Sequence, residues 1–235
     1  MPILDAIRGA FALLLSGDAA LWTIVWISLK TSVVGLLLAA PLAIVLGYAI
    51  ASFRFGGRRL VIWLVQASLS MPTVLIGLLL YLMLSRQGPL GGLHWLFSQS
   101  GIIAGQCLIA LPVLLAFTLS AVQAADPRYA ETAITLGAGR WRVMATVLFE
   151  ARFGVMAAVI SGFGRVISEV GCALMVGGNI AGETRTITTA IALETSKGEF
   201  AQGIALGIVL IVVALAMNGA LMLAQGDAHA ARGRP

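Results

Sequence analysis

The sequence of 235 residues contains few charged side chains, cysteines or histidines. Charged residues make up 11% of the chain, whereas soluble domains carry about 25% and disordered chains are rich in charge. This scarcity excludes a soluble enzyme domain and a disordered chain. The two cysteines, Cys107 and Cys172, lie far apart in apolar runs, and the two histidines are His94 and His229. These four residues suggest neither a disulfide framework nor a metal site.

Nucleotide-binding patterns are also missing. No GxxxxGK[ST] loop occurs, and the fragments at Gly137–Gly139 and Gly162–Gly164 lack the third glycine of a dinucleotide site. We therefore expect no cofactor in this chain, and if ATP supplies energy, a separate ATPase subunit must hold ATP and magnesium. A membrane-embedded enzyme would need a nucleophile with a base, or a metal cluster, and the isolated histidines do not supply one, so we expect no catalytic residue. The net charge is +5, but the basic residues are scattered between apolar runs, so nucleic acid is not an expected partner.

Long apolar runs dominate the sequence, which is 60% apolar with a mean hydropathy of +1.00. A bilayer core about 30 Å thick requires about 20 apolar residues per helix. Five runs reach that length, near residues 22–52, 60–85, 101–124, 153–177 and 200–225. The sequence therefore predicts an all-α membrane protein with five transmembrane helices in one domain, residues 19–225, embedded in the lipid bilayer.

The two ends of the chain lie outside these runs. Residues 1–18 carry apolar side chains at helical spacing, which predicts an amphipathic helix at the membrane interface. Residues 226–235 are expected to form a cytoplasmic tail. Three predicted spans contain a proline, Pro41, Pro72 or Pro112, and each proline is either an ordinary kink or a break beside a cavity.

Positive charge is distributed unequally between the connections. One side of the membrane receives Arg54, Arg58, Arg59, Arg128, Arg140, Arg142, Arg152, Arg232 and Arg234, and the other receives Arg8, Lys30, Arg86, Arg185 and Lys197. Because cytoplasmic loops carry the excess of lysine and arginine, the N-terminus is predicted outside and the C-terminus inside.

The cytoplasmic connection over residues 126–152 is too long for a plain turn. Within it, residues 128–136 can form a short helix, because Asp126-Pro127 precedes this stretch and Gly137 follows it. This helix either docks on another protein or covers lipid headgroups.

The residues Glu131, Thr132, Ala133 and Gly137 resemble the EAA loop of permease subunits in ABC importers. That loop reads Glu-Ala-Ala, three residues, Gly, nine residues, then Ile-x-Leu-Pro. In this chain Thr132 replaces the second residue, Val147 replaces Ile, and Phe149-Glu150 replace Leu-Pro. The resemblance implies the fold of a type I ABC importer permease, in which these four residues dock on an ATPase subunit as a coupling helix.

A polar stripe interrupts the fourth predicted span. Arg165 and Glu169 are four residues apart, so one helix face can hold both, and Ser161, Ser168 and Cys172 extend that face. One interpretation makes Ser161, Arg165, Ser168 and Glu169 a translocation path for an oxyanion, because a guanidinium group suits a tetrahedral anion. A structural ion pair is equally compatible, because Glu169 would repel the same anion. A third possibility is a secondary transporter in which Glu169 relays protons and Arg165 is its countercharge.

The outer loop over residues 178–199 resembles the corresponding loop in permeases of tungstate importers, the relatives of molybdate and sulfate permeases. Gly-Gly-Asn-Ile-Ala-Gly-Glu-Thr-Arg begins the resemblance at Gly177, and a short helix is expected over residues 188–195. The family implies an extracytoplasmic substrate-binding protein, with Asn179, Glu183, Arg185 and Glu194 as contact candidates. It also implies two ATPase subunits, a second copy of the permease, tungstate or molybdate as substrate with sulfate as an alternative, and the plasma membrane of a prokaryote.

Overall fold

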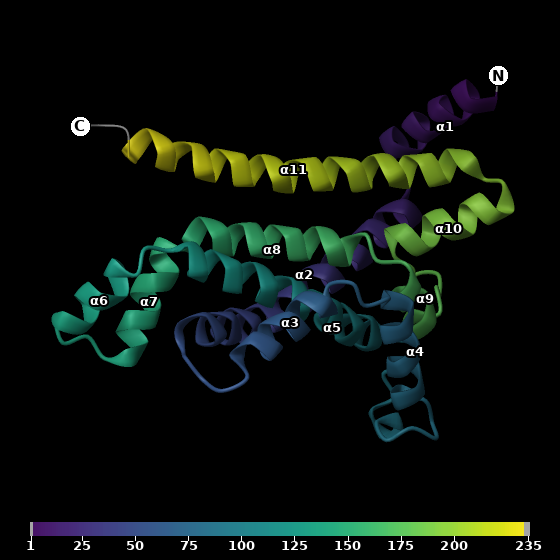
Figure 1. The fold of residues 1–235 in the computed structure, drawn as a ribbon. Helices are drawn as coiled ribbons and strands as arrows, with labels where there is room; N and C mark the ends of the chain where they lie inside the picture. Colours follow the sequence, from purple (N-terminus) through teal and green to yellow (C-terminus); the bar gives the residue numbers. More distant parts are fainter. Residues whose placement is uncertain (1, 233–235) are drawn as a thin grey trace. The chain divides into compact units, whose positions relative to one another are not determined.

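The computed structural model describes residues 2–232, and every regular element in this range is helical (Figure 1). The long helices are α2 (Ala19–Ser52), α5 (Gln99–Ala124), α8 (Arg152–Ile167) and α11 (Phe200–Arg232). The shorter ones are α1 (Pro2–Ser16), α3 (Arg58–Ser68), α4 (Thr73–Leu84), η1 (Gly91–Leu93), α6 (Arg128–Thr135), α7 (Arg140–Glu150), α9 (Gly171–Gly177) and α10 (Ile187–Lys197). The prediction of an all-α fold is confirmed.

Within the described residues, three helices are long and apolar enough to cross a membrane by themselves: α2, α5 and the part of α11 up to Gly219. The count reaches five when each of two broken helix pairs, α3 with α4 and α7 with α8, forms one span. The predicted runs 22–52 and 101–124 lie within α2 and α5, and both helices continue through their internal prolines, Pro41 and Pro112.

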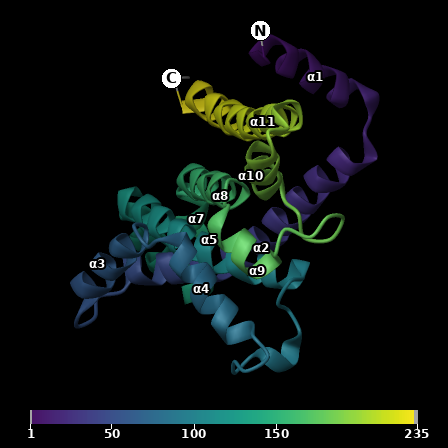
Figure 2. The same cartoon turned by 90° about the vertical axis from the view of Figure 1, so that its right-hand side faces the viewer.

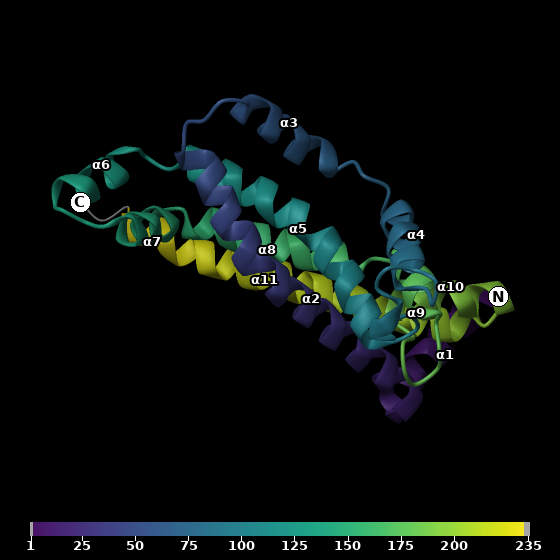
Figure 3. The same ribbon diagram turned by 90° about the horizontal axis from the view of Figure 1, so that it is seen from below.

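The second predicted run, residues 60–85, is not one continuous helix. Helix α3 ends at Ser68, and α4 begins at Thr73, directly after Pro72. Figure 3 shows α3 as a separate helix with extended segments at both of its ends. Pro72 has no amide hydrogen, and its ring disfavours helical geometry at the preceding Met71. Proline therefore breaks the helix here.

The fourth predicted run, residues 153–177, is also wrong as a single helix. Helix α8 ends at Ile167, and α9 starts only at Gly171. The Ser168 hydroxyl donates a hydrogen bond to the Gly164 carbonyl oxygen at 2.7 Å, and the Glu169 carboxylate accepts one from the Cys172 amide at 3.0 Å. These side chains compete with the backbone pattern of a helix and end it without glycine or proline.

Contacts divide the chain into two compact units. Unit 1 comprises residues 1–35, 72–109 and 164–217, and unit 2 comprises residues 36–71, 110–163 and 218–235. The core of unit 1 gathers buried residues from α1, α2, α10 and α11: Ala10, Leu21, Ile24, Val25, Ile187, Ala190, Ala205 and Leu206. The core of unit 2 gathers Tyr48, Val122, Ala133, Val143, Val147 and Ala151.

Helix α1 corresponds to the amphipathic helix predicted for residues 1–18. It lies against the first turns of α11, where Ala10 is fully buried and Gly9 faces Ala201 (Figures 1 and 2). Ile7, Phe11 and Leu15 are exposed on α1. Its position at a membrane surface stays a prediction. The predicted tail over residues 226–235 is helical through Arg232, and its last three residues lie outside the described range.

Candidate functional site

Helix α6 begins and ends where the local sequence predicts. The Asp126 carboxylate accepts a hydrogen bond from the Arg128 amide at 2.9 Å, which satisfies one free donor of the first turn. At the other end, Gly137 has a φ of +79°. The Ala138 amide donates to the Ala133 carbonyl oxygen, and the Gly137 amide donates to that of Ile134. This pair of bonds is a Schellman motif, so the glycine of the EAA-like pattern serves to end α6.

Helices α6 and α7 form a hairpin (Figure 1) and contribute to one small buried cluster. Ala133 is only 8% exposed and contributes to the same buried cluster as Val143 and Val147 of α7. Tyr48 of α2 and Val122 of α5 belong to this cluster too. The small side chain of Ala133 therefore packs inside this cluster. It leaves little surface for a partner protein. The structure adds α7, which the sequence pattern did not predict.

The other residues of the EAA-like motif lie on the surface of the hairpin. Glu131, Thr132 and Gly137 are exposed. A groove of about 570 Å³ runs along the hairpin, with Thr132, Tyr129 and Leu136 of the α6 side and Arg142 of α7 among its lining residues. Asp126 and Arg128 also border it, so the groove combines an apolar floor with charges of both signs. Such a surface suits a protein partner.

Sequence reasoning missed the exposed apolar side chains of this hairpin. Leu136 is 82% exposed, Trp141 65% and Ile134 61%. The sequence could have indicated these residues, because they are large apolar side chains in an otherwise polar connection. Exposed apolar patches of this kind mark interaction surfaces.

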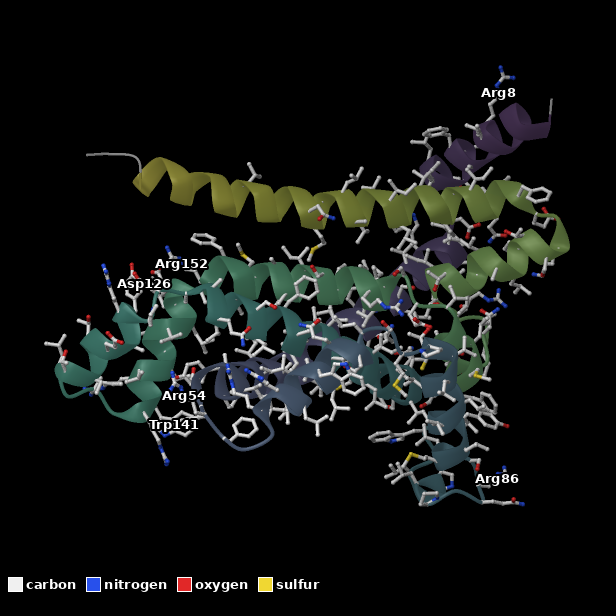
Figure 4. The ribbon with its side chains drawn as sticks, viewed as in Figure 1. Arg8, Arg54, Arg86, Asp126, Trp141 and Arg152 are labelled. Atoms are coloured by element: carbon white, nitrogen blue, oxygen red, sulfur yellow. The ribbon has the colours of Figure 1, made fainter. Side chains whose placement is uncertain are left out.

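The connection from α7 to α8 is a bend of 74°. Arg152 lies at this bend, with its guanidinium group 4.5 Å from the Phe149 ring centroid and 4.6 Å from that of Phe153 (Figure 4). It also donates a hydrogen bond to the Phe149 carbonyl oxygen at 2.8 Å. Phe149 stands where the family pattern has leucine, so here an aromatic and cationic cluster stabilises the corner that leads from the hairpin into α8.

Arg165 and Glu169 form the predicted ion pair, but only Arg165 is helical. The Arg165 guanidinium nitrogen lies 3.6 Å from a Glu169 carboxylate oxygen. The Arg165 side chain is 42% exposed, whereas that of Glu169 is 3% exposed. The second Glu169 oxygen accepts the bond from the Cys172 amide, and the Glu169 carbonyl oxygen accepts one from the Thr188 hydroxyl at 2.6 Å. Glu169 is thus committed to interactions inside unit 1.

This geometry separates the roles of the two charges. A guanidinium group has five N–H donors, and one carboxylate oxygen at 3.6 Å leaves most of them available. Ser168 and Ser161 are also exposed, but the Ser168 hydroxyl is directed to its own helix backbone. Arg165 therefore keeps donors that Glu169 does not use, whereas both carboxylate oxygens of Glu169 have partners within unit 1.

The segment that begins at Gly178 is a tightly bonded loop followed by α10. The Thr184 hydroxyl donates to the Gly177 carbonyl oxygen at 2.6 Å and accepts from the Ile180 amide at 2.9 Å. Thr186 and Thr189 form a reciprocal cap at the start of α10. The Ile187 amide donates to the Ser28 hydroxyl of α2 at 2.6 Å. These bonds fix the loop on unit 1.

The four predicted contact residues of this segment differ in exposure. Glu183 is exposed, and its carbonyl oxygen accepts a bond from Gln99 at 2.9 Å. Asn179 and Arg185 are half-buried, with the Arg185 guanidinium 3.5 Å from the Asn179 carbonyl oxygen. Glu194 is only 5% exposed and pairs with Lys197 at 3.0 Å. The exposure of Glu194 therefore does not fit a surface contact, because α10 turns this side chain inward.

Among the described residues, no group of three or more histidine, cysteine, aspartate or glutamate side chains is placed to hold a metal ion.

Comparison with known sequences adds a family to this geometry. Residues 11–225 match the family described as "Binding-protein-dependent transport system inner membrane component". The tungstate uptake system permease protein of Campylobacter jejuni is 38% identical over 216 residues, which cover 92% of this chain and 90% of that protein. The molybdenum transport system permease protein of Escherichia coli K12 is 30% identical over 211 residues, which cover 86% and 91% of the two chains.

Comparison with solved structures addresses the fold. A chain in the crystal structure of a bacterial alginate ABC transporter, in complex with its pentasaccharide-bound periplasmic protein, matches with a TM-score of 0.73. The match covers 95% of this chain and 86% of the other at 20% identity. This likeness concerns the fold alone.

Proposed function

Because the chain belongs to the family of binding-protein-dependent transport system inner membrane components, we propose that it is the permease subunit of an ATP-driven importer for an oxyanion. The single observation that carries this proposal is the identity of 38% with a tungstate uptake permease over nearly the whole length of both chains. We rank tungstate first and molybdate second, because identity falls to 30% for the molybdenum permease. The two anions share charge and shape, so the binding protein is expected to select between them. Sulfate is the remaining alternative.

The proposed coupling surface is the exposed side of the α6–α7 hairpin. Glu131 and Thr132 are exposed there, Gly137 ends α6, and the adjacent groove carries apolar and charged residues. An ATPase subunit that binds this surface would move the hairpin as one body, because Ala133 holds α6 on α7. The bend at Arg152 would pass that movement to α8. In this proposal the permease itself neither binds nor hydrolyses ATP.

The proposed anion contact is Arg165. Its side chain is half exposed near the end of α8. The buried Glu169 carboxylate contacts one nitrogen of its guanidinium group. A charged side chain inside a membrane normally faces a cavity or a partner. A second copy of the permease would supply the opposite wall of such a cavity, and closed twofold symmetry is the usual arrangement. Each copy would bind one ATPase subunit.

The outer partner in this proposal is a substrate-binding protein, and Glu183 is the exposed candidate contact. Loaded binding protein and ATP would both favour the outward-facing state, so each should strengthen the effect of the other. We place the complex in the plasma membrane of a prokaryote.

A secondary transporter driven by a proton gradient is the competing function. It requires Glu169 to take up and release protons, but both carboxylate oxygens have partners inside unit 1. The geometry therefore favours a structural role of Glu169 over a proton relay.

The test is reconstitution of the permease with its ATPase in proteoliposomes that contain ATP. ATP hydrolysis and anion uptake are measured against tungstate, molybdate and sulfate, with and without binding protein. We expect tungstate-loaded binding protein to stimulate both activities. Uptake that follows a proton gradient without ATPase, or that survives deletion of residues 128–139, would contradict the importer.

A further inference from the structure

A second groove lies on another side of α6, between the hairpin and the end of α2. Its volume is about 660 Å³, within the range of pockets that bury small ligands. Val45 and Ala49 of α2, Phe53 beyond it, and Met144 of α7 form its apolar wall. Arg140 and Trp141 line the end that belongs to the hairpin. All of these residues belong to unit 2.

The groove lies beside the C-terminal end of α2, where the apolar helix is followed by a basic segment. Helix α2 is a strong membrane-span candidate, with a mean hydropathy of 2.5 in its best window, and it ends at Ser52. Arg54, Arg58 and Arg59 follow within a few residues. Arg58 donates to the Ile50 and Ala51 carbonyl oxygens at 2.8 and 2.9 Å, which fixes this basic segment against the helix end. These three arginines follow the groove along the chain, and Arg140 is the arginine among its described lining residues, so one positive charge meets the apolar wall there.

Aromatic side chains at the groove have the exposure expected of a membrane interface. Trp141 is 65% exposed and Phe53 is 60% exposed. Tryptophan is enriched at the level of lipid headgroups, because its ring is apolar and its N–H is polar. If this connection were surrounded by water alone, these two large aromatic side chains would face water without any apolar partner. Their exposure therefore favours contact with lipid.

The charge of the groove is positive only. No acidic residue occurs among its described lining residues, and the Arg140 guanidinium lies 5.7 Å from the Trp141 ring centroid. Figure 4 shows Arg54 and Trp141 at the same end of unit 2, which agrees with the groove that Phe53 and Trp141 share. A ligand that complements this surface has a negative group and a long apolar tail.

We propose that this groove binds an anionic phospholipid from the leaflet on the arginine-rich side of the membrane. One acyl chain lies along Val45, Ala49 and Met144, and the phosphate lies against Arg140. Basic pockets beside membrane helices recognise anionic headgroups in this way.

The ATPase subunit is the other possible occupant of this groove. The residues that line the two grooves show which groove suits the ATPase and which suits a lipid. Thr132 of the EAA-like motif lines the first groove, together with charges of both signs. The second groove is lined instead by Ala130 and Ile134 of the same helix. Helix α6 can therefore bind protein on one side and lipid on another.

The experiment is native mass spectrometry of the permease–ATPase complex during titration with phosphatidylglycerol or phosphatidylcholine. Arg140→Gln is compared with Arg142→Gln, which removes the same charge from the same helix but lines the first groove. We expect the wild-type complex to prefer phosphatidylglycerol. Arg140→Gln should weaken phosphatidylglycerol binding about fivefold, the effect of one arginine near an anionic surface. Arg142→Gln should leave it unchanged.

A second variant tests the apolar part of the groove without a change of charge. Val45→Trp places a larger side chain on an exposed position of the wall and should reduce the binding of both lipids. Equal phosphatidylglycerol binding by Arg140→Gln and Arg142→Gln would overturn the proposal. Loss of ATPase from Arg140→Gln with unchanged lipid binding would assign the groove to the ATPase. Displacement of the lipid by inorganic phosphate alone would also overturn the proposal, since the apolar wall would then have no role.

Discussion

Gly137 adopts a backbone conformation that residues with a Cβ atom reach only at a cost. Its φ is +79°, and no atom lies within 4 Å of the position that a Cβ atom would occupy, so strain in the backbone is the whole penalty of a substitution. Gly137→Ala should destabilise the end of α6 by about 1–2 kcal/mol. We expect weaker association with the ATPase subunit, measured by co-purification at increasing salt.

Gly139→Ala is the matched control for this prediction. Gly139 also has open space around it, but its φ is −68°, which alanine adopts freely. Equal loss of ATPase from the two variants would show that the left-handed conformation of Gly137 does not matter.

Arg165 carries the predicted anion contact. Arg165→Gln removes the positive charge and shortens the side chain but leaves it polar. Uptake of the oxyanion should fall at least about tenfold, because hydrogen bonds to charged groups contribute about 1.5–3 kcal/mol. The complex should still assemble, since this side chain is 42% exposed. Uptake into proteoliposomes and size-exclusion chromatography measure the two effects. Normal uptake would remove Arg165 from the path.

Glu169→Gln provides the comparison for Arg165→Gln. The amide oxygen of glutamine can still accept the bond from the Cys172 amide, so the break between α8 and α9 should persist. We expect this variant to transport the anion, because the glutamate interacts within the protein. Loss of ATP-driven uptake in both variants, with both complexes intact, would favour a role for the ion pair as a unit.

At the scale of elements, α5 and α9 approach each other too closely for a side chain at Gly105. A Cβ atom there would lie 2.5 Å from the Cys172 sulfur. Gly105→Ala should therefore destabilise unit 1 by about 1–3 kcal/mol through overpacking. Cys172→Ala removes the sulfur and should restore most of the stability, a coupling that a double-mutant cycle measures by the midpoint of thermal unfolding.

Gly207→Ala in α11 is the control for Gly105→Ala, because no atom lies within 4 Å of its Cβ position. It should raise the unfolding midpoint slightly rather than lower it, because alanine is favoured over glycine inside a helix by about 0.5–1 kcal/mol. If Cys172→Ala fails to rescue Gly105→Ala, the sulfur contact is not the cause of the destabilisation.

The sequence predicts those helices whose ends are set by residues with strong local preferences, such as proline and glycine. The predicted helix over residues 128–136 differs from α6 by one residue, because Asp126-Pro127 and Gly137 act locally. The end of α8 was not predictable in this way. Side chains such as those of Ser168 and Glu169 also occur inside helices, and the Glu169 carbonyl oxygen accepts its hydrogen bond from Thr188, which comes 19 residues later in the chain.

For the candidate site residues too, local features could be predicted from the sequence and long-range packing could not. The spacing of Arg165 and Glu169 was enough to indicate that they can pair, and the two side chains do lie 3.6 Å apart. It could not show that Glu169 is buried or that Glu194 turns inward to Lys197, because burial depends on packing between distant segments. The apolar residues Ile134 and Trp141 were overlooked because single apolar residues in a connection carry no periodic signal.

For the whole molecule, the distribution of arginine predicts which side of the membrane each loop faces. Thr132 and Glu183 are both exposed, one on α6 and one on the outer segment. A cysteine at Glu183 should react with a membrane-impermeant maleimide in intact cells. A cysteine at Thr132 should react only after the cells are opened. The measurement is the fraction of permease labelled under each condition.

The native cysteines set the background for this labelling. Cys172 is buried and Cys107 is half-buried, so wild-type permease should label weakly. Reaction of the cysteine at Thr132 in intact cells would reverse the predicted orientation and place the hairpin on the wrong side for an ATPase.

The shared cluster beneath the hairpin limits how such permeases can be recombined. Tyr48 and Val122 contact the same buried group as Ala133 and Val143, although they lie far away in the sequence. An engineer who grafts residues 126–152 from another transporter would exchange four of the six buried residues of this cluster and leave Tyr48 and Val122 behind. A chimaera that also transfers the residues at positions 48 and 122 should fold more readily than one built from the loop alone.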